Sequence, residues 1–178
     1  PSINLGCVLE SCELKMLREA FVSQHQQNEF ELNNDELHLY SRQILLDGWD
    51  IDAQEKLKLA NVLIIGAGGI GCTSAELLAR AGVGKITLLD GDTIEISNLQ
   101  RQIAFSPKDL GRFKAEVLAK HLRNINPHIQ VEYHNMRLDE HNADDLVQHA
   151  DLVLDGCDNF ARHYLVNGRC VKHQVALC

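Results

Sequence analysis

A glycine-rich turn near the middle of this chain joins a short apolar run to a helical segment. The apolar run is Asn61–Ile65, the turn is Gly66-Ala67-Gly68-Gly69-Ile70-Gly71, and the helical pattern continues to Arg80. A second apolar run follows over 85–89 and ends on Asp90. A strand that enters a tight glycine turn, leaves as a helix and returns as a parallel strand is the first unit of a nucleotide-binding α/β sheet.

The residue types in this unit suit a phosphate and a ribose. Glycines let the backbone approach an anion without a side-chain clash, and the next helix points free N–H groups at it. An acid about 20 residues beyond the loop is placed to accept hydrogen bonds from ribose hydroxyls. The candidate nucleotide-binding residues are therefore Gly66, Gly68, Gly69, Gly71 and Asp90.

Strand and helix patterns alternate along the rest of the chain. This order predicts a doubly wound, Rossmann-like α/β fold with a mostly parallel sheet and helices on both faces, incomplete at the C-terminus. We also expect a helix from Asn34 or Asp35 that buries Leu37, Tyr40, Ile44 and Leu45, followed by a short helix near 52–59. The other predicted strands are 62–65, 86–89, 129–134, 151–155 and 175–178, and the other predicted helices are 70–81, 111–124, 141–149 and 159–172.

Composition limits the functional classes. The formal net charge of −8 argues against a nucleic-acid surface. No apolar run approaches the length of a membrane span, so we expect no membrane partner. The six cysteines are scattered without a C-x-x-C pair, which favours free thiols in a reducing, cytoplasmic setting. Residues 1–34 are polar and aperiodic and are predicted to be a poorly ordered extension, with the nucleotide-binding domain over 35–178.

Several charged residues are predicted to meet at the carboxyl ends of the strands. Arg101 follows the second strand, Lys114 is near the start of the next helix, and Asp155, Asp158 and Asn159 follow the strand 151–155. Each has an ordinary alternative role, as a helix cap, an exposed lysine or a surface ion pair. Two cations and a second carboxylate around a nucleotide loop together indicate phosphate chemistry with Mg²⁺.

With these residues the chain resembles the HesA/MoeB/ThiF family, whose members are relatives of the ubiquitin-activating enzymes. The resemblance runs in order from about residue 35 to the end, and its closest branch is molybdopterin-synthase adenylyltransferase, with the thiamine branch second. Its most specific motifs are Ser97-Asn98-Leu99-Gln100-Arg101-Gln102 and D-x-x-D-N. The further matches are Tyr40–Ile44, the glycine loop, Asp90, Lys114, Gly48–Asp52 and Asn124–His128.

The resemblance implies ATP-dependent adenylylation of the C-terminal glycine carboxylate of a ubiquitin-like sulfur-carrier protein. It implies that Asp158 holds Mg²⁺, with Asn159 beside it, and that Arg42 reaches across a homodimer into the neighbouring site. The catalytic set would be Arg42, Arg101, Lys114 and Asp158. The ATP-binding residues would be the four loop glycines, Asp90, Ser97, Asn98, Leu99, Gln100, Arg101, Lys114, Asp158 and Asn159.

The chain departs from the family pattern in two respects. Phe113 stands where the family often has proline, which could displace the backbone of Lys114. The family's later half, which carries two C-x-x-C pairs for structural zinc and the groove for the carrier's tail, is not in these residues. We therefore expect weak ATP binding and little turnover from the 178 residues by themselves.

Two other functions fit parts of the pattern. An NAD-dependent oxidoreductase would satisfy the glycine loop and Asp90 equally well, but it leaves Arg101, Lys114 and Asp158 without a shared purpose. A non-catalytic module that only docks a carrier would be marked by loss of Arg42, Arg101 or Asp158, and all three are present.

Overall fold

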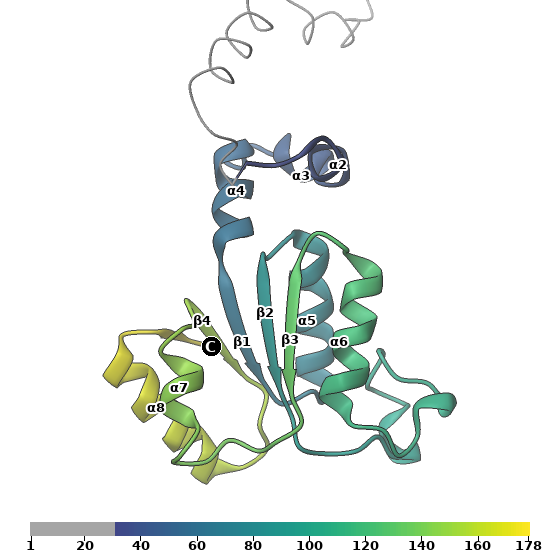
Figure 1. The fold of residues 1–178 in the computed structure, drawn as a ribbon, viewed down its shortest axis with the longest axis vertical. Helices are drawn as coiled ribbons and strands as arrows, with labels where there is room; N and C mark the ends of the chain where they lie inside the picture. The colour runs from purple at the N-terminus through teal and green to yellow at the C-terminus, as the bar shows by residue number, and fades with distance from the viewer. Residues whose placement is uncertain (1–30) are drawn as a thin grey trace, which may run out of the picture.

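The computed structural model describes residues 31–178 as one parallel sheet covered by helices (Figure 1). The strand order is β3-β2-β1-β4-β5, and every neighbouring pair is parallel. This confirms the predicted doubly wound α/β fold. The strands are β1 (Asn61–Ile65), β2 (Lys85–Leu89), β3 (Gln130–His134), β4 (Leu152–Asp155) and β5 (Ala176–Leu177).

Strand β1 is buried on both faces, as a central parallel strand should be. Val62 and Ile64 belong to the core under α5 (Gly69–Ala81) and α6 (Lys114–Ile125). The alternate residues Leu63 and Ile65 belong to the core on the opposite face, under α7 (Ala143–Val147) and α8 (Phe160–His173). The two helical layers lie on either side of the sheet in Figure 1. The 2-residue alternation of the strand therefore builds two separate cores.

The chain order places a crevice at one edge of the sheet. Strands β2 and β3 are added on one side of β1, and the chain then crosses over to add β4 on the other side. The loops after β1 and β4 consequently leave in opposite directions beyond the carboxyl ends of the strands. Open α/β sheets bind ligands at such a switch point.

Three short helices precede the sheet and cover its amino end (Figure 1). The predicted single helix that starts at Asn34 or Asp35 is wrong, because the chain breaks at Tyr40, whose φ and ψ of −93° and 7° are not helical. Tyr40 is buried, and its hydroxyl accepts a 2.7 Å hydrogen bond from Asn126. Leu37 is half-buried rather than buried, and Leu45 is 79% exposed. The helices are α2 (Asn34–Leu39), α3 (Ser41–Ile44) and α4 (Ile51–Leu59).

The helix predicted from Gly111 begins at Lys114 instead. Gly111 has φ of +80°, a left-handed conformation that cannot begin a helix. The C-terminal boundary is confirmed: the helix ends at Ile125, ahead of Pro127. The link between β2 and α6 also contains two single 3₁₀ turns, Ile96–Asn98 and Pro107–Asp109.

The first described residues already belong to the packed unit. Leu32 is buried, and Asn33 caps α2 by accepting a 2.9 Å hydrogen bond from the Glu36 backbone. Most of the predicted N-terminal extension, residues 1–30, lies outside the described residues. Within residues 31–178, no helix has both the length and the apolar character that a membrane crossing requires.

Candidate nucleotide site

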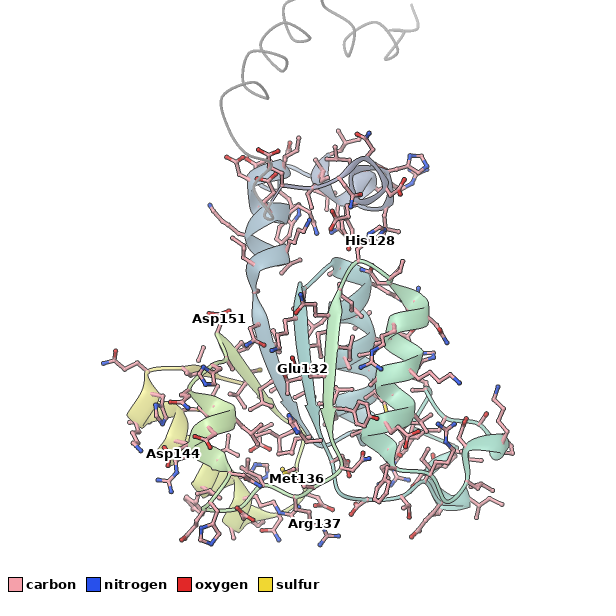
Figure 2. The ribbon with its side chains drawn as sticks, in the orientation of Figure 1. His128, Glu132, Met136, Arg137, Asp144 and Asp151 are labelled. Atoms are coloured by element: carbon pink, nitrogen blue, oxygen red, sulfur yellow. The ribbon has the colours of Figure 1, made fainter. Side chains whose placement is uncertain are left out.

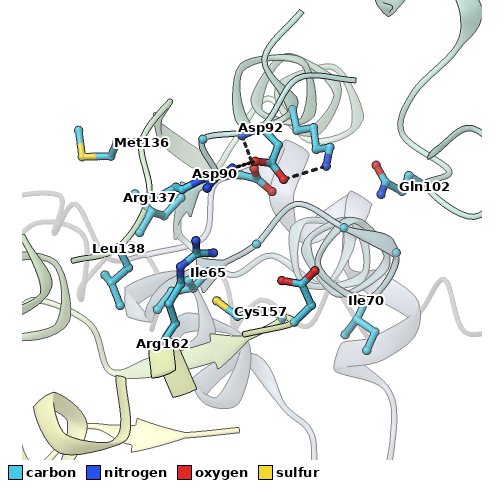
Figure 3. A pocket seen from close by; sticks show the side chains of 18 of the residues that line it. Ile65, Ile70, Asp90, Asp92, Gln102, Met136, Arg137, Leu138, Cys157 and Arg162 are labelled. Atoms are coloured by element: carbon cyan, nitrogen blue, oxygen red, sulfur yellow. Dashed lines mark hydrogen bonds and ion pairs between the residues drawn. The ribbon is translucent and has the colours of Figure 1, made fainter. Parts of the chain in front are cut away.

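A cleft of about 410 Å³ lies beyond the carboxyl ends of β1, β2 and β4 (Figure 3). It occupies the switch point, and its walls come from loops widely separated in the sequence. The structure brings seven of the predicted site residues together in its lining: Gly66, Gly68, Gly69, Asp90, Arg101, Lys114 and Asp158.

The glycines of the loop divide into two groups. Gly66 has φ of +92°, and a Cβ on it would lie 2.8 Å from the carbonyl oxygen of Gly156. A Cβ on Gly71 would lie 1.8 Å from the carbonyl oxygen of Gly66, so these two positions require glycine for packing. A Cβ on Gly68 would meet nothing within 4 Å, and one on Gly69 would make only ordinary contacts with Arg101. Gly68 and Gly69 therefore leave backbone open to the cleft at the start of α5, where an anion is stabilised.

Asp90 fastens the glycine loop to the end of β2. Its carboxylate accepts 2.7 Å hydrogen bonds from the backbone N–H groups of Ala67 and Asp92. Each oxygen keeps a lone pair, since an ionised carboxylate offers about four acceptor positions. Asp90 can therefore hold the loop and still accept hydrogen bonds from ribose hydroxyls.

Lys114 is a buried cation at the floor of the cleft. Its ammonium lies 3.4 Å from a carboxylate oxygen of Asp92, and its backbone N–H donates to the Asp92 carbonyl at 3.0 Å. The other oxygen of Asp92 accepts a 2.8 Å bond from Arg137. Arg137 first, and then the charge of Lys114, lower the pKa of Asp92 below its usual range, so this carboxylate stays ionised between its two cations.

Phe113, which stands where the family often has proline, adopts a backbone conformation that a proline could also adopt. Phe113 precedes the helix with φ of −66°, which is the value that a proline ring enforces. The expected displacement of the lysine is therefore not required by this backbone. Arg101 lies nearby with its side chain beside Gly69, and its guanidinium donates to the Ser97 carbonyl at 3.0 Å.

The remaining predicted residues do not line this cleft. Gly71 packs against Gly66, and Asn98 closes its own 3₁₀ turn by accepting a 3.0 Å bond from the Glu95 backbone. Asn159 caps α8 as predicted, accepting from the backbone N–H groups of Ala161 and Arg162. The predicted residues outside the lining are Arg42, Gly71, Ser97, Asn98, Leu99, Gln100 and Asn159.

Arg42 lies at the opposite end of the molecule from the cleft. It is an exposed residue of α3, in the group of helices at the amino end of the sheet (Figure 1). The structure thus does not bring Arg42 to the site of its own chain.

Four polar lining residues were not predicted as site residues: Asp92, Gln102, Arg137 and Arg162. Gln102 could have been predicted from the sequence, because it directly follows Arg101. Its side chain is 2% exposed and its buried carbonyl oxygen has no hydrogen-bond partner within the described residues. Arg137 comes from the loop after β3, to which the sequence assigned no site, and Arg162 comes from the first turn of α8, just after the predicted Asp158 and Asn159 (Figure 3).

Cys157 lines the cleft as a half-buried free thiol, as the scattered cysteines suggested. Burial first, and then the Asp155 carboxylate that accepts its hydrogen bond, raise the pKa of this thiol to about 12. The thiol therefore stays protonated at physiological pH.

We expect Cys157 to resist alkylation in the folded protein at pH 8. Its thiolate fraction should be about a thousandfold lower than that of an unfolded cysteine, because its pKa moves from 9.0 to about 12. Peptide mass spectrometry after iodoacetamide treatment, with and without urea, measures the difference. Comparable rates in the two conditions would contradict it, and Cys178, which is exposed, is the internal control for reagent access.

The cleft offers one uncommitted acid as a metal ligand. Within residues 31–178, no group of three or more His, Cys, Asp or Glu side chains is placed to hold a metal ion. Mg²⁺ often keeps several waters and takes only one or two carboxylates together with substrate phosphates. Asp158, exposed at the cleft, fits that kind of binding.

Comparison with known proteins finds relatives that are named adenylyltransferases. The chain is 46% identical over 147 residues to the molybdopterin-synthase adenylyltransferase of Escherichia coli, covering 83% of this chain and 59% of that protein. It is 38% identical over 171 residues to the adenylyltransferase and sulfurtransferase MOCS3 of Aedes aegypti, covering 90% and 39%. It thus spans less than two thirds of the length of these relatives.

Two solved structures share the fold. The ATP complex of the E. coli tRNA N6-threonylcarbamoyladenosine dehydratase TcdA matches with a TM-score of 0.77 and 27% identity, over 82% of this chain and 59% of that one. E. coli MccB with ATP matches with a TM-score of 0.73 and 31% identity, over 94% and 52%. The model of the ThiF family matches residues 40–178. Because that match takes in the sheet, the cleft and most of the chain, the chain belongs to the ThiF family.

Proposed function

We propose that the protein adenylylates the C-terminal glycine carboxylate of a ubiquitin-like sulfur-carrier protein, with ATP as the second substrate and pyrophosphate as the leaving group. The observation that carries the proposal is the convergence of Arg101, Lys114 and Asp158 on a cleft floored by the open glycines 68 and 69. Relatives named adenylyltransferases support it.

The residues of the cleft suit this reaction. A carboxylate is already ionised at neutral pH, so its attack on the α-phosphate needs no protein base. The protein must hold the two substrates in line and neutralise the charge that develops on the phosphates and the departing pyrophosphate. Lys114 and Arg101 carry the positive charges for this task, and the start of α5 adds backbone N–H donors. Such fixed charges act strongly because the lysine is buried.

Asp158 would hold a Mg²⁺ ion that arrives with the nucleotide. The ion would supply further neutralisation of phosphate charge. Asn159, the next residue, keeps the segment in place through its cap of α8. A bound Mg²⁺ would explain why an exposed acid lines a site for a highly charged anion.

The substrate carrier we favour is the small subunit of molybdopterin synthase, with the thiamine sulfur carrier second. The relatives of 44% and 46% identity bear the name molybdopterin-synthase adenylyltransferase. ATP–pyrophosphate exchange on the intact protein with each carrier tests the choice. We expect exchange with the molybdopterin-synthase subunit and none when its terminal glycine is deleted. Exchange that is independent of any carrier, or absent with both, would contradict the proposed function.

We also propose that Arg42 acts in the site of a second copy in a homodimer. Its position at the amino end of the sheet leaves it remote from the cleft of its own chain (Figure 1). Arg42→Ala and Arg101→Ala proteins should each be inactive. In a 1:1 re-associated mixture, half of the dimers carry one intact site, so about a quarter of wild-type exchange should return.

The mixture of Arg42→Ala with Lys114→Ala is a matched test, and it should recover to the same level. The mixture of Arg101→Ala with Lys114→Ala should stay inactive, because both substitutions fall in the same site. Equal recovery in all mixtures, or recovery in none, would contradict the role of Arg42 across the dimer.

A further inference from the structure

We propose that Arg137 is the residue that recognises the nucleobase, by stacking its guanidinium plane on the purine ring. The inference rests on the proposed function, since it requires a nucleoside triphosphate in this cleft. It assigns a role to a residue outside the S-N-L-Q-R-Q and D-x-x-D-N motifs.

The strand order fixes the direction in which a nucleotide lies. Phosphates belong at the tip of β1, where Gly68 and Gly69 leave the backbone open. The ribose belongs at the tip of β2, next to Asp90. The next strand in the sheet is β3, on the far side of β2 from β1. The base therefore falls at the tip of β3, two strand spacings or roughly 10 Å from the phosphates.

The tip of β3 carries Met136, Arg137 and Leu138, and all three line the cleft. Figure 2 shows His128 just before β3, at the amino end of the sheet, and Met136 and Arg137 just after β3, at the carboxyl end. In Figure 3, Arg137 and Leu138 lie on one side of Asp90, and Gln102 and Ile70 lie on the other. The cleft thus has one end lined by Arg137 with Met136 and Leu138, and another end with the glycine loop, Arg101 and Lys114.

Two contacts fix Arg137 in this place. Its guanidinium donates to Asp92 at 2.8 Å, and this carboxylate stays ionised because its pKa is lowered. Gly91 lets the β3 loop come close, since a Cβ there would lie 2.9 Å from the Cγ of Arg137. An otherwise exposed arginine, with 64% of its side chain accessible, therefore presents a pre-oriented plane to the cleft.

Leu138 adds an apolar side chain to the same end of the cleft. It is 5% exposed and packs in the core under α7 and α8. A purine ring placed between Leu138 and Arg137 would gain hydrophobic burial on one face and a cation–π contact on the other. Lysine could not replace the arginine, because an ammonium has charge but no plane.

Calorimetric titration of the intact protein with ATP, AMP and inorganic pyrophosphate tests this role. We expect Arg137→Leu to weaken the binding of ATP and of AMP by the same factor, about tenfold, and to leave the binding of pyrophosphate unchanged. Arg137→Lys should not restore the affinity for either nucleotide. Arg80→Leu is the matched control, since Arg80 is also an exposed arginine in a 2.7 Å ion pair, at the far end of α5 from the cleft.

The outcomes separate this inference from the proposed function. Wild-type protein that binds ATP, with an Arg137→Leu variant that binds AMP equally well, overturns only the role of Arg137. A loss that is as large for pyrophosphate as for AMP, or rescue by Arg137→Lys, indicates a phosphate contact and overturns stacking. Wild-type protein that does not bind ATP overturns both. Unchanged thermal unfolding of the variants shows that the fold is intact.

Discussion

Gly71→Ala is expected to destabilise the domain by about 3 kcal/mol or more, the upper end of what core overpacking costs. The added Cβ would lie 1.8 Å from the carbonyl oxygen of Gly66. That oxygen cannot retreat, because Gly66 donates its N–H to Leu89 at 2.8 Å and packs against Gly156. The start of α5 would have to separate from β1, and the contact is backbone on backbone, so no side chain can relax to absorb it.

Gly68→Ala is the matched control, three residues away in the same loop. A Cβ there meets nothing within 4 Å, so stability should change by less than about 1 kcal/mol. The methyl group would occupy space that a phosphate needs, and ATP affinity should fall at least tenfold. Urea unfolding and ATP titration on both variants measure the two effects. Equal stability of the two variants would contradict the distinction between Gly71, which is needed for packing, and Gly68, which leaves backbone open for a ligand.

Lys114→Ala is expected to reduce the rate of the proposed carrier adenylylation by about 10²–10³, as the loss of a fixed charge at a developing anion does. The lysine is buried and held from two sides by Asp92, so its ammonium is oriented before a nucleotide arrives. The loss should appear mainly in kcat, because the charge that Lys114 stabilises is greatest in the transition state.

Lys120→Ala provides the comparison on the same helix, since Lys120 is exposed. Steady-state pyrophosphate release, at saturating ATP and carrier, gives kcat for both variants. A Lys114→Ala enzyme with wild-type kcat and a raised KM would contradict the transition-state role and leave Lys114 as a binding residue only. A defect of similar size in Lys120→Ala would indicate a general effect of charge rather than a specific one.

The parts of the fold that a local pattern dictates were predictable. The apolar runs at 61–65 and 85–89 became adjacent parallel strands, and Asn159 caps α8 as its position indicated. The single N-terminal helix was not predictable, because Tyr40 breaks it through a contact with Asn126, 86 residues away. Periodicity within a window contains no information about such a partner. The late start of α6 has the same kind of cause, since Gly111 donates its N–H to the Ile94 carbonyl.

The site residues that belong to a sequence motif or follow a predicted strand were predictable. Those that stand alone in the sequence and reach the cleft only through the fold were not. Gly68, Asp90 and Asp158 each follow a predicted strand, so the parallel sheet brings them to one edge. Arg162 lies in the first turn of α8, where an arginine is ordinarily a solvent-exposed residue, so its residue type gave no signal even though Asp158 and Asn159 are close in the sequence. Arg42 is the opposite case. The sequence assigned it to the site because its motif resembles that of the family, yet in a single chain it lies far from the cleft.

The contact between Gly66 and Gly156 joins the loop after β1 to the loop that carries Asp158. With the would-be Cβ of Gly66 only 2.8 Å from the Gly156 carbonyl, neither loop has room to slide past the other. The Gly156 N–H also donates to the Ile65 carbonyl at 2.8 Å, which ties the second loop to the strand that begins the first. The glycine loop and the loop that carries Asp158 are thus held together as one rigid unit. Little conformational entropy remains for a nucleotide to remove from these two loops when it binds, so its contacts there contribute almost fully to affinity.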